Sequence, residues 1–440
     1  MNEQIVTDAR AIFKAAVRGV QADVLMERLD WPALLGRPAE AFRRIVVVGM
    51  GKAAMAMASV AEAHFGERVA EGVVVVPHGY ASTLPYPFRT PRRIETLEAG
   101  HPVPDEASAD AAYAILDHAT RCGEEDLLIV LISGGGTALT TAFAESIPAD
   151  EGRHVIRMLL ESGADIAEMN AVRKKLSVLG GGRLAQAAAP ARVLALAISD
   201  VPGDDLTVIA SGPTVPDDST FAGAIDILKR YDLWERVADS VQRHLEAGAE
   251  GAIPETPRAG DPIFERTQTM LIGRNRDAIA SACLEATSRG YRVSIVDRPV
   301  TGEARKVGEG LVADLDRHAT DDAPHCVLWG GETTVKVVGR GRGGRNQELA
   351  LGAALALEGR KRPVLLLSAG TDGVDGPTDA AGAWVTTYTA EAARHHRLDP
   401  VAHLDNNDTF PFFERMNALL QPGPTHTNVM DVMIALQPAP

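Results

Sequence analysis

Two runs of apolar residues constrain the fold of this chain most strongly. Arg43–Val48 (RRIVVV) and Leu127–Ile132 (LLIVLI) both have the composition of buried strands, and each leads into a glycine-rich turn and then a helical pattern. Val193–Ile198 and Pro363–Ser368 are further buried strands that end in polar loops. This repeated strand–loop–helix order predicts an α/β fold with parallel sheets.

The length of 440 residues is too great for one ordinary domain and suits two. Residues 247–263 are rich in Ala, Gly and Pro without periodicity, which is typical of a linker. The sequence therefore predicts a larger domain over residues 1–246 and a smaller one over residues 264–440. The assignment of the C-terminal tail is left open, because the residues after about 400 can belong to the second domain or pack back on the first.

Charge and composition narrow the choice of partners. The net charge of −15 argues against nucleic acid or an anionic membrane as the main partner. The N-terminus lacks a signal-peptide core, and no apolar run reaches the length of a membrane span. The cysteines at positions 122, 283 and 326 form no CxxC pair, so we expect a cytoplasmic protein. The oligomeric state stays open, with a homo-oligomer as one option.

The turn after the first strand, GMGKAA, fits the loosened dinucleotide fingerprint G-x-G-x-x-A. Gly49 and Gly51 shape this turn, and we expect them to lie against the substrate. Lys52 stands at the N-terminus of the next helix, where its charge reinforces the attraction of the helix dipole for an anion. The next strand ends in Pro77-His78 with no carboxylate for a ribose, which counts against a dinucleotide.

A second glycine loop, Ser133-Gly134-Gly135-Gly136-Thr137, lies between a buried strand and a helix. We expect its backbone N–H groups to bind an anion, although an ordinary βα loop without a ligand is the alternative. His101, in a rigid turn with two prolines, is interpreted as a structural histidine.

Two further polar features follow in the first half of the chain. The basic run Arg173-Lys174-Lys175 is expected near the start of a helix that begins about Asn170, and it is either solvated or present for a ligand. Asp200 follows a buried strand, which makes it a candidate catalytic base or metal ligand.

The stretch GGETTVKVVGRGRGGRNQ, residues 330–347, holds six glycines and three arginines. Arginine forks among glycines suit phosphate or carboxylate, and Gly343, Gly344 and Glu332 are the predicted phosphate-binding or nucleotide-binding residues. A flexible basic hairpin is the alternative. Asp372, in a later glycine-rich turn, indicates a hard-cation or hydroxyl site, or else an Asx turn.

Taken together, several motifs resemble one family. They are GMGKAA, GHPVPDEAS, LISGGGTAL, MNAVRKKLSVLGGGRLA, SDVPGDDLTVIASGPT, GGETTVKVVGRGRGGRNQELAL, SAGTDGVDGPTDAAGA and GPTHTNVMD, and they span nearly the whole chain. This set resembles the class II glycerate 2-kinases, the MOFRL family, some of whose members were labelled hydroxypyruvate reductases.

The resemblance implies a larger Rossmann-like domain, a smaller C-terminal α/β domain of MOFRL type and an active site between them. It also implies ATP- and Mg²⁺-dependent phosphorylation of D-glycerate to 2-phosphoglycerate. The family's essential lysine and arginine match Lys52 and Arg345, and Glu332, Asp372 and Asn428 match other polar positions of its cleft.

The resulting hypothesis assigns a role to each group. Lys52 and Arg345 stabilise the moving phosphoryl group, and the glycine loops position the phosphates or the glycerate carboxylate. Asn428 is expected to bind substrate. Asp200, or else Asp372, accepts the proton of the C2 hydroxyl or binds Mg²⁺. The alternative activity is an NAD(P)H-dependent hydroxypyruvate reductase.

Overall fold

The computed structural model describes residues 3–318 and 323–439, which fold into two compact units. The middle unit runs from Met26 to Ile272. The terminal unit combines the residues up to Leu25 with those from Gly273 onward. In sequence, the middle unit is therefore an insertion in the terminal unit.

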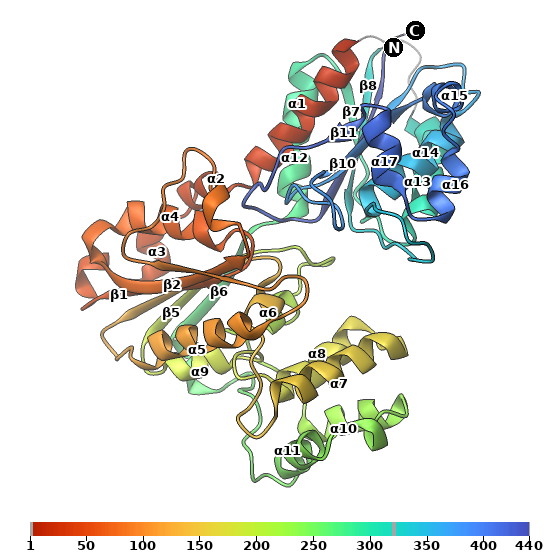
Figure 1. Cartoon of the computed structure of the whole chain (residues 1–440). Coiled ribbons are helices and arrows are strands. Elements are labelled where there is room, and N and C mark those ends of the chain that lie inside the picture. The colour runs from red at the N-terminus through yellow and green to blue at the C-terminus, as the bar shows by residue number, and fades with distance from the viewer. Residues whose placement is uncertain (1–2, 319–322, 440) are drawn as a thin grey trace. The chain divides into compact units, whose positions relative to one another are not determined.

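Within the described residues, the middle unit is built on a six-stranded sheet with the order β3-β2-β1-β4-β5-β6 (Figure 1). The β3–β2, β2–β1, β1–β4 and β4–β5 pairs are parallel. The order reverses between β1 and β4, so the sheet has the doubly wound, Rossmann-like topology that we predicted. The strands are β1 Ile45–Met50, β2 Val69–Pro77, β3 Glu95–Ala99, β4 Leu127–Ile132, β5 Arg192–Ile198 and β6 Thr267–Gly273.

The apolar strand sequences match their positions in this sheet. Every residue of β1 and β4 is buried, because helices cover both faces. Figure 1 shows α4 on one face and α5 and α9 on the other. The helices around the sheet are α2 Ala22–Glu27, α3 Trp31–Leu35, α4 Ala54–Phe65, α5 Glu106–Thr120, α6 Gly136–Leu139 and α9 Arg183–Ala188. Short 3₁₀ helices are η1 Ala39–Ala41, η2 Gly66–Arg68, η3 Ala81–Thr83, η4 Ile209–Ser211, η5 Trp234–Arg236 and η6 Pro262–Glu265.

Four helices of the middle unit form a helical lobe beside the sheet (Figure 1). They are α7 Ala149–Ser162, α8 Ile166–Leu176, α10 Phe221–Arg230 and α11 Asp239–Ala249. The lobe has a hydrophobic core of its own, in which Leu159, Val172, Phe221 and Leu245 are fully or almost fully buried. It is therefore a distinct layer of the unit.

The basic run 173–175 lies at the end of α8, so our prediction of a helix start there is wrong. The helix begins earlier, where Asp165 and Glu168 form a capping box. Cations are favoured at a helix C-terminus by the dipole, which removes the conflict that the sequence posed.

Lys174 and Lys175 of this run are buried against one carboxylate. The two Nζ atoms each lie 3.2 Å from an oxygen of Asp217. Lys175 also donates to Glu255 at 2.9 Å. Burial alone would raise the pKa of Asp217, but the hydrogen bond from Ser219 and the lysine charges outweigh it and lower the pKa to about 2. These two lysines therefore stabilise the fold by ion pairing.

We expect Lys175→Met to lower the free energy of unfolding by about 3–5 kcal/mol, because it removes one of the two lysine charges paired with the buried Asp217 carboxylate. Urea unfolding followed by circular dichroism measures the change. Lys229→Met, on the exposed end of α10, is the matched control, with an expected change within about 0.5 kcal/mol. Equal unfolding of the two variants would contradict a stabilising role of the buried pair.

In the terminal unit, six described strands form a second sheet with the order β11-β10-β9-β12-β8-β7. Only β7–β8 is parallel among its described pairs, whereas β12 runs antiparallel to both β8 and β9. The expectation of a parallel sheet is therefore wrong for most of this unit. The strands are β7 Arg292–Ile295, β8 His325–Gly331, β9 Leu365–Gly370, β10 Gly382–Thr386, β11 Leu419–Leu420 and β12 Asp431–Gln437.

Helices cover both faces of this second sheet. Figure 1 shows α1 beside α12 on one face and α13 beside α14 on the other. Trp329 of β8 is buried in the core on the α13–α14 side. The helices are α1 Glu3–Gly19, α12 Asn275–Ser288, α13 Ala304–His318, α14 Arg345–Leu357, α15 Thr389–His395, α16 Pro400–Asp405 and α17 Thr409–Arg415.

The division into units differs from the predicted domains at two places. Helix α1 belongs to the terminal unit, because Asp8 pairs with Arg289 at 2.8 Å and accepts a hydrogen bond from Tyr291. The predicted linker, residues 247–263, lies inside the middle unit, where Glu255 binds Lys175. The tail after residue 400 lies in the terminal unit, within the predicted second domain, and supplies β12 to the middle of its sheet rather than packing back on the first domain.

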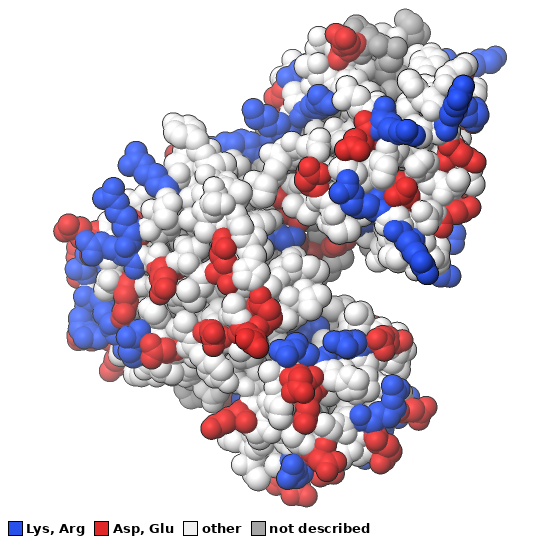
Figure 2. Space-filling model, viewed as in Figure 1, with Lys and Arg blue, Asp and Glu red and all other residues white. Residues whose placement is uncertain are grey.

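The surface carries both signs of charge. Figure 2 shows acidic and basic side chains interspersed over the visible face. The net charge of −15 is therefore not gathered in one patch of that face. Across residues 3–318 and 323–439, no helix has the length and hydropathy needed to cross a membrane.

Candidate active site

The two predicted glycine loops of the middle unit meet at the switch point of its sheet. Ser133 N donates to the Met50 carbonyl, and Lys52 N donates to the Gly134 carbonyl, both at 3.0 Å. Ser133 Oγ accepts from Ala53 N at 2.9 Å. The loops that follow β1 and β4 are therefore joined by direct hydrogen bonds, at the position where doubly wound sheets bind ligands.

Gly51 is required for this close approach. Its φ is +117°, and a Cβ atom there would lie 2.3 Å from the Ser133 carbonyl oxygen. No other residue fits without moving the two loops apart. The fingerprint glycine is thus explained by loop–loop packing, and its predicted contact with substrate stays a prediction, as does that of Gly49.

His101 packs directly on the second glycine loop. A Cβ atom at Gly135 would lie 2.7 Å from His101 Cδ2 and 2.8 Å from Nε2. The helix that follows this loop, α6, has only four residues, so its dipole contributes less than the sequence suggested. Any anion bound here depends on the loop N–H groups and on neighbouring side chains such as His101. Sequence reasoning treated this histidine as structural.

Lys52 and Asp200 lie at the same edge of the sheet as the glycine loops. Lys52 directly precedes Ala53, the N-cap of α4, as expected, and is half-buried. Asp200 follows β5, which pairs in parallel with β4 in the register Ile132–Ala197, and it too is half-buried. The fold thus gathers the predicted residues of the middle unit at one strand-end edge.

Two loops that sequence reasoning left out complete this edge. Thr137 Oγ1 lies 3.2 Å from Ser211 Oγ. The Ser211 carbonyl in turn accepts from Gly181 N at 2.9 Å. Ala210 and Ser211 adopt positive φ angles of 49° and 61°, which are uncommon for residues with a side chain. The motifs GGGRLA and ASGPT were the available signal, because both are dense in small and turn-forming residues.

In the terminal unit, Arg345 is held by two carboxylates. Its Nε lies 2.6 Å from Asp431 Oδ2 and its Nη2 lies 2.8 Å from Asp431 Oδ1, a bidentate pair. Its Nη1 lies 3.2 Å from Glu332 Oε1. Burial alone would lower the pKa of Arg345, but the charge of Asp431 and then that of Glu332 outweigh it and raise the pKa. The predicted Arg345 and Glu332 are thus brought together.

The sheet register explains this gathering. Asp431 begins β12 and lies opposite Gly331 of β8 and Gly370 of β9. Glu332 and Asp372 follow these glycines at the ends of their strands. Sequence reasoning missed Asp431, although it ends the motif GPTHTNVMD. Its importance depends on the pairing with Arg345, which lies 86 positions away.

Asp375 fixes the start of α14, the helix that carries Arg345. It accepts hydrogen bonds from the backbone N–H groups of Asn346 at 3.0 Å and Gln347 at 2.9 Å. Complete burial raises its pKa to about 6, although these N–H donors oppose the shift. Sequence reasoning missed Asp375, although it lies in the same glycine-rich turn as Asp372.

The predicted Gly343 and Gly344 pack against the same loop. A Cβ atom at Gly344 would lie 2.3 Å from Asp375 Cγ. A Cβ atom at Gly376 would lie 2.4 Å from the Gly343 carbonyl oxygen. Close packing therefore accounts for these glycines, and their binding of phosphate stays a prediction.

Asp372 and Asn428 are largely buried, with exposed fractions of 4% and 8%. Asp372 Oδ1 accepts from Val374 N at 3.1 Å, the Asx-type turn that was the alternative interpretation. Asn428 Oδ1 accepts from Met430 N at 3.2 Å. The two predicted metal ligands belong to different units, Asp200 to the middle one and Asp372 to the terminal one. Over the described part of the chain, no cluster of three or more acidic, His or Cys side chains could hold a metal.

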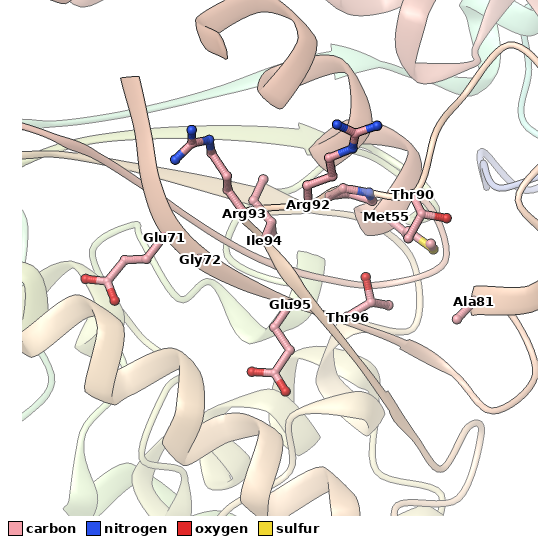
Figure 3. A pocket seen from close by; sticks show the side chains of 11 residues that line it. Met55, Glu71, Gly72, Ala81, Thr90, Arg92, Arg93, Ile94, Glu95 and Thr96 are labelled. Carbon is pink, nitrogen blue, oxygen red and sulfur yellow. The ribbon is translucent and has the colours of Figure 1, made fainter. Parts of the chain in front are cut away.

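Two hollows of different character lie in the middle unit. The larger, of about 590 Å³, lies along the first residues of β3 and carries Arg92, Arg93, Glu71 and Glu95 at its rim (Figure 3). It lies by the amino ends of the strands, away from the glycine loops. The smaller, of about 390 Å³, begins at Thr137, where the second glycine loop ends. Only the smaller one adjoins the candidate site.

Comparison with known proteins decides the family. The model of a domain of unknown function (DUF4147) matches residues 8–246, and the MOFRL family model matches residues 325–431. The D-glycerate 2-kinase of Thermotoga maritima is 40% identical over 397 residues, which cover 89% of this chain and 90% of that protein. The chain belongs to the glycerate kinase family.

Other members of the glycerate kinase family match over more than nine-tenths of their length. The crystal structure of a glycerate kinase from Thermotoga maritima superposes with a TM-score of 0.84 at 37% identity, covering 99% of this chain and 100% of that one. The glycerate kinase of Homo sapiens is 35% identical, with 98% of this chain and 93% of that protein covered. A protein of Agrobacterium vitis named putative hydroxypyruvate reductase is 38% identical, with coverages of 97% and 93%. The resemblance seen in the motifs is confirmed.

The ion pair of Arg345 leads to a first prediction on activity in this glycerate kinase family member. Asp431→Asn keeps the size of the side chain but removes its charge, so Arg345 loses its bidentate partner and its orientation. Because Arg345 is a predicted catalytic group and a small displacement of such a group is costly, we expect kcat to fall about 10²-fold. Steady-state kinetics with D-glycerate and ATP measure the change.

Asp316→Asn is the control, since Asp316 pairs with Arg360 on an exposed part of the same unit. We expect its kcat to match that of the wild type. An unchanged kcat in the Asp431 variant would show that the orientation of Arg345 does not limit turnover.

Proposed function

We propose that this protein is a D-glycerate 2-kinase, which transfers the γ-phosphoryl group of ATP to the C2 hydroxyl of D-glycerate. The single observation that carries the proposal is the 40% identity to a D-glycerate 2-kinase over nine-tenths of that protein. The geometry supports it, because each unit gathers polar groups at the ends of its central strands. Phosphoryl transfer needs such positioned charges and little covalent chemistry.

We propose that Lys52 and Arg345 stabilise the negative charge that develops on the transferred phosphoryl group. Lys52 is half-buried beside two hydrogen-bonded glycine loops. Arg345 is fixed by Asp431, yet a quarter of its side chain is exposed. An arginine held in this way can offer its remaining N–H groups to an anion without reorganising when charge develops. We propose that both residues serve one reaction.

The acceptor hydroxyl requires a base or a hydrogen-bond acceptor. Asp200 suits this role, because it is a half-buried carboxylate at a strand end and therefore remains accessible. Asp372 suits it less well, since only 4% of it is exposed and Val374 N already occupies one of its oxygens. We therefore propose Asp200, in preference to Asp372, as the residue that accepts the hydroxyl proton or helps to bind Mg²⁺.

Mg²⁺ in kinases is held by one or two carboxylates, with the remaining ligands from phosphates and water. The residues present fit that pattern, because Asp200 is a single accessible carboxylate beside the glycine loops. Bound there with the nucleotide, Mg²⁺ would neutralise charge on the phosphates. The residues of the chain orient the two substrates.

A second candidate, an NAD(P)H-dependent hydroxypyruvate reductase, is favoured by the Rossmann-like strand order and by the glycine turn after β1. The strand that would carry the ribose-binding carboxylate, β2, instead ends in Pro77 and continues to His78. The kinase accounts for more of the site, because phosphoryl transfer uses both charged groups, Lys52 and Arg345, whereas the ribose-binding carboxylate of a dinucleotide site is missing after β2.

One incubation separates the two activities. Purified protein is mixed with D-glycerate, ATP and Mg²⁺, and the products are resolved by phosphorus NMR. We expect the signal of 2-phosphoglycerate. A 3-phosphoglycerate signal would overturn the position of transfer. The absence of a phosphorylated product, together with consumption of NADH on hydroxypyruvate, would favour the reductase.

Lys52→Ala and Arg345→Ala test whether these two residues stabilise the charge of the transferred phosphoryl group. We expect each substitution to lower kcat by about 10²-fold or more, because each removes an electrostatic contact to the transition state. Far-ultraviolet circular dichroism checks that the variants are folded. Arg243→Ala, an exposed residue of α11, is the control and should keep the wild-type kcat. Near-normal turnover in the Lys52 or Arg345 variant would refute the assignment for that residue.

A further inference from the structure

The smaller pocket of the middle unit lies between the glycine-loop edge and the helical lobe. Its volume is about 390 Å³. One wall begins at Thr137, the last residue of the second glycine loop, and the opposite wall is formed by Ile156 and Leu160 of α7. Phe143 and Leu179 add further apolar surface. The pocket is thus continuous with the loop that we predict to bind phosphate.

The pocket is larger than a glycerate molecule requires. Pockets for cofactor-sized ligands span about 300–1,000 Å³, and this one falls in that range. A three-carbon acid is far smaller and offers little apolar surface. Leu160 and Val103 on the pocket lining are 66% and 72% exposed, so apolar side chains remain uncovered there. The ligand that fits has a flat or bulky part with apolar faces.

The charge of the pocket adds a second requirement. Arg153, Arg157 and Arg173 line it, and none of them forms an ion pair with a carboxylate among the described residues. The side chain of Arg173 donates to Asn170 Oδ1 at 2.8 Å, and burial lowers its pKa. By contrast, Arg345 in the terminal unit is neutralised by two carboxylates. Arginines that line one pocket without acidic partners suit a polyanionic ligand.

The polar side of the pocket is held in an uncommon backbone conformation. Ala210 and Ser211 both line it at positive φ, and Ser211 Oγ lies 3.2 Å from Thr137 Oγ1. Strained residues of this kind cluster at ligand sites, where the surrounding structure over-determines them. Here the loop of Gly180 packs behind Ser211, because a Cβ atom at Gly180 would lie 3.2 Å from the Ser211 carbonyl oxygen.

We propose that this pocket binds the purine and ribose of the nucleotide. Its arginines would meet the polyphosphate, which would lead past Thr137 and Ser211 to the loop of residues 133–136. The inference rests on the proposed kinase function and names the part of the chain that selects the phosphoryl donor. It makes the helical lobe a nucleotide-binding element.

The test measures binding of ADP by titration calorimetry in the absence of glycerate. Ile156→Trp fills the pocket from a half-buried position, and Arg173→Gln removes a charge. We expect each to raise the Kd of ADP about 10-fold or more, Ile156→Trp because it occupies the space of the ligand and Arg173→Gln because a hydrogen bond to a charged group is worth about that factor. Steady-state kinetics should show a matching rise in the KM of ATP and an unchanged KM of D-glycerate.

Matched controls lie on the same lobe outside the pocket. Ile166→Trp changes an isoleucine that is 52% exposed at the start of α8, and Arg243→Gln changes an exposed arginine of α11. Both should keep the wild-type Kd within about twofold. Arg157→Gln, at an exposed position of the pocket rim, replaces either pocket variant that fails to fold.

The remaining outcomes separate this inference from the proposed function. A raised KM of D-glycerate with an unchanged Kd of ADP would place the acceptor in the pocket and overturn the inference while the kinase stands. Unchanged values for both ligands, or no binding of ADP to the wild type, would also overturn it. Loss of ADP binding in the pocket variants of a protein that never phosphorylates glycerate would support the pocket and refute the kinase.

Discussion

Direct backbone contact between the turns after β1 and β4 is the constraint on which the middle unit's polar edge depends. The contact exists only because Gly51 carries no side chain and Ser133 can donate and accept at once. It fixes the second glycine loop, and that loop in turn places Thr137 against Ser211. A glycine pattern commonly associated with dinucleotides therefore serves here as a joint between two loops.

In the terminal unit, the main constraint is that Arg345 must stay charged and oriented at a partly buried position. Three adjacent strands each contribute through their ends, and the carboxylate of Asp431 is fully buried. The carboxylate of Asp375 accepts hydrogen bonds from backbone N–H groups in the first turn of α14. The helix and the guanidinium of Arg345 are therefore anchored by separate contacts. Positioning by independent contacts is what electrostatic catalysis requires, because the group must not reorganise during the reaction.

The sequence predicted those parts of the structure that depend on local composition. The predicted strand Leu127–Ile132 coincides with β4, because a strand buried on both faces must be apolar throughout. The position of β12 was not predictable, since its partners β8 and β9 are antiparallel to it and distant in the chain. The run 173–175 shows in the same way that local sequence does not reveal the tertiary contacts of single residues. Adjacent helical positions face different directions, and only the location of Asp217 and of the pocket decides which residue pairs with a carboxylate and which lines a cavity.

The split composition of the terminal unit has a consequence for how the chain is made. Helix α1 packs on α12, yet the whole middle unit is synthesised between them. At about 5–20 residues per second, translation of residues 26–272 takes roughly 12–50 s. During that time the apolar face of α1, with Ile5, Ile12 and Phe13, has no native partner outside the ribosome. The middle unit is complete first, and the N-terminal helix waits for its native partners until the rest of its own unit emerges.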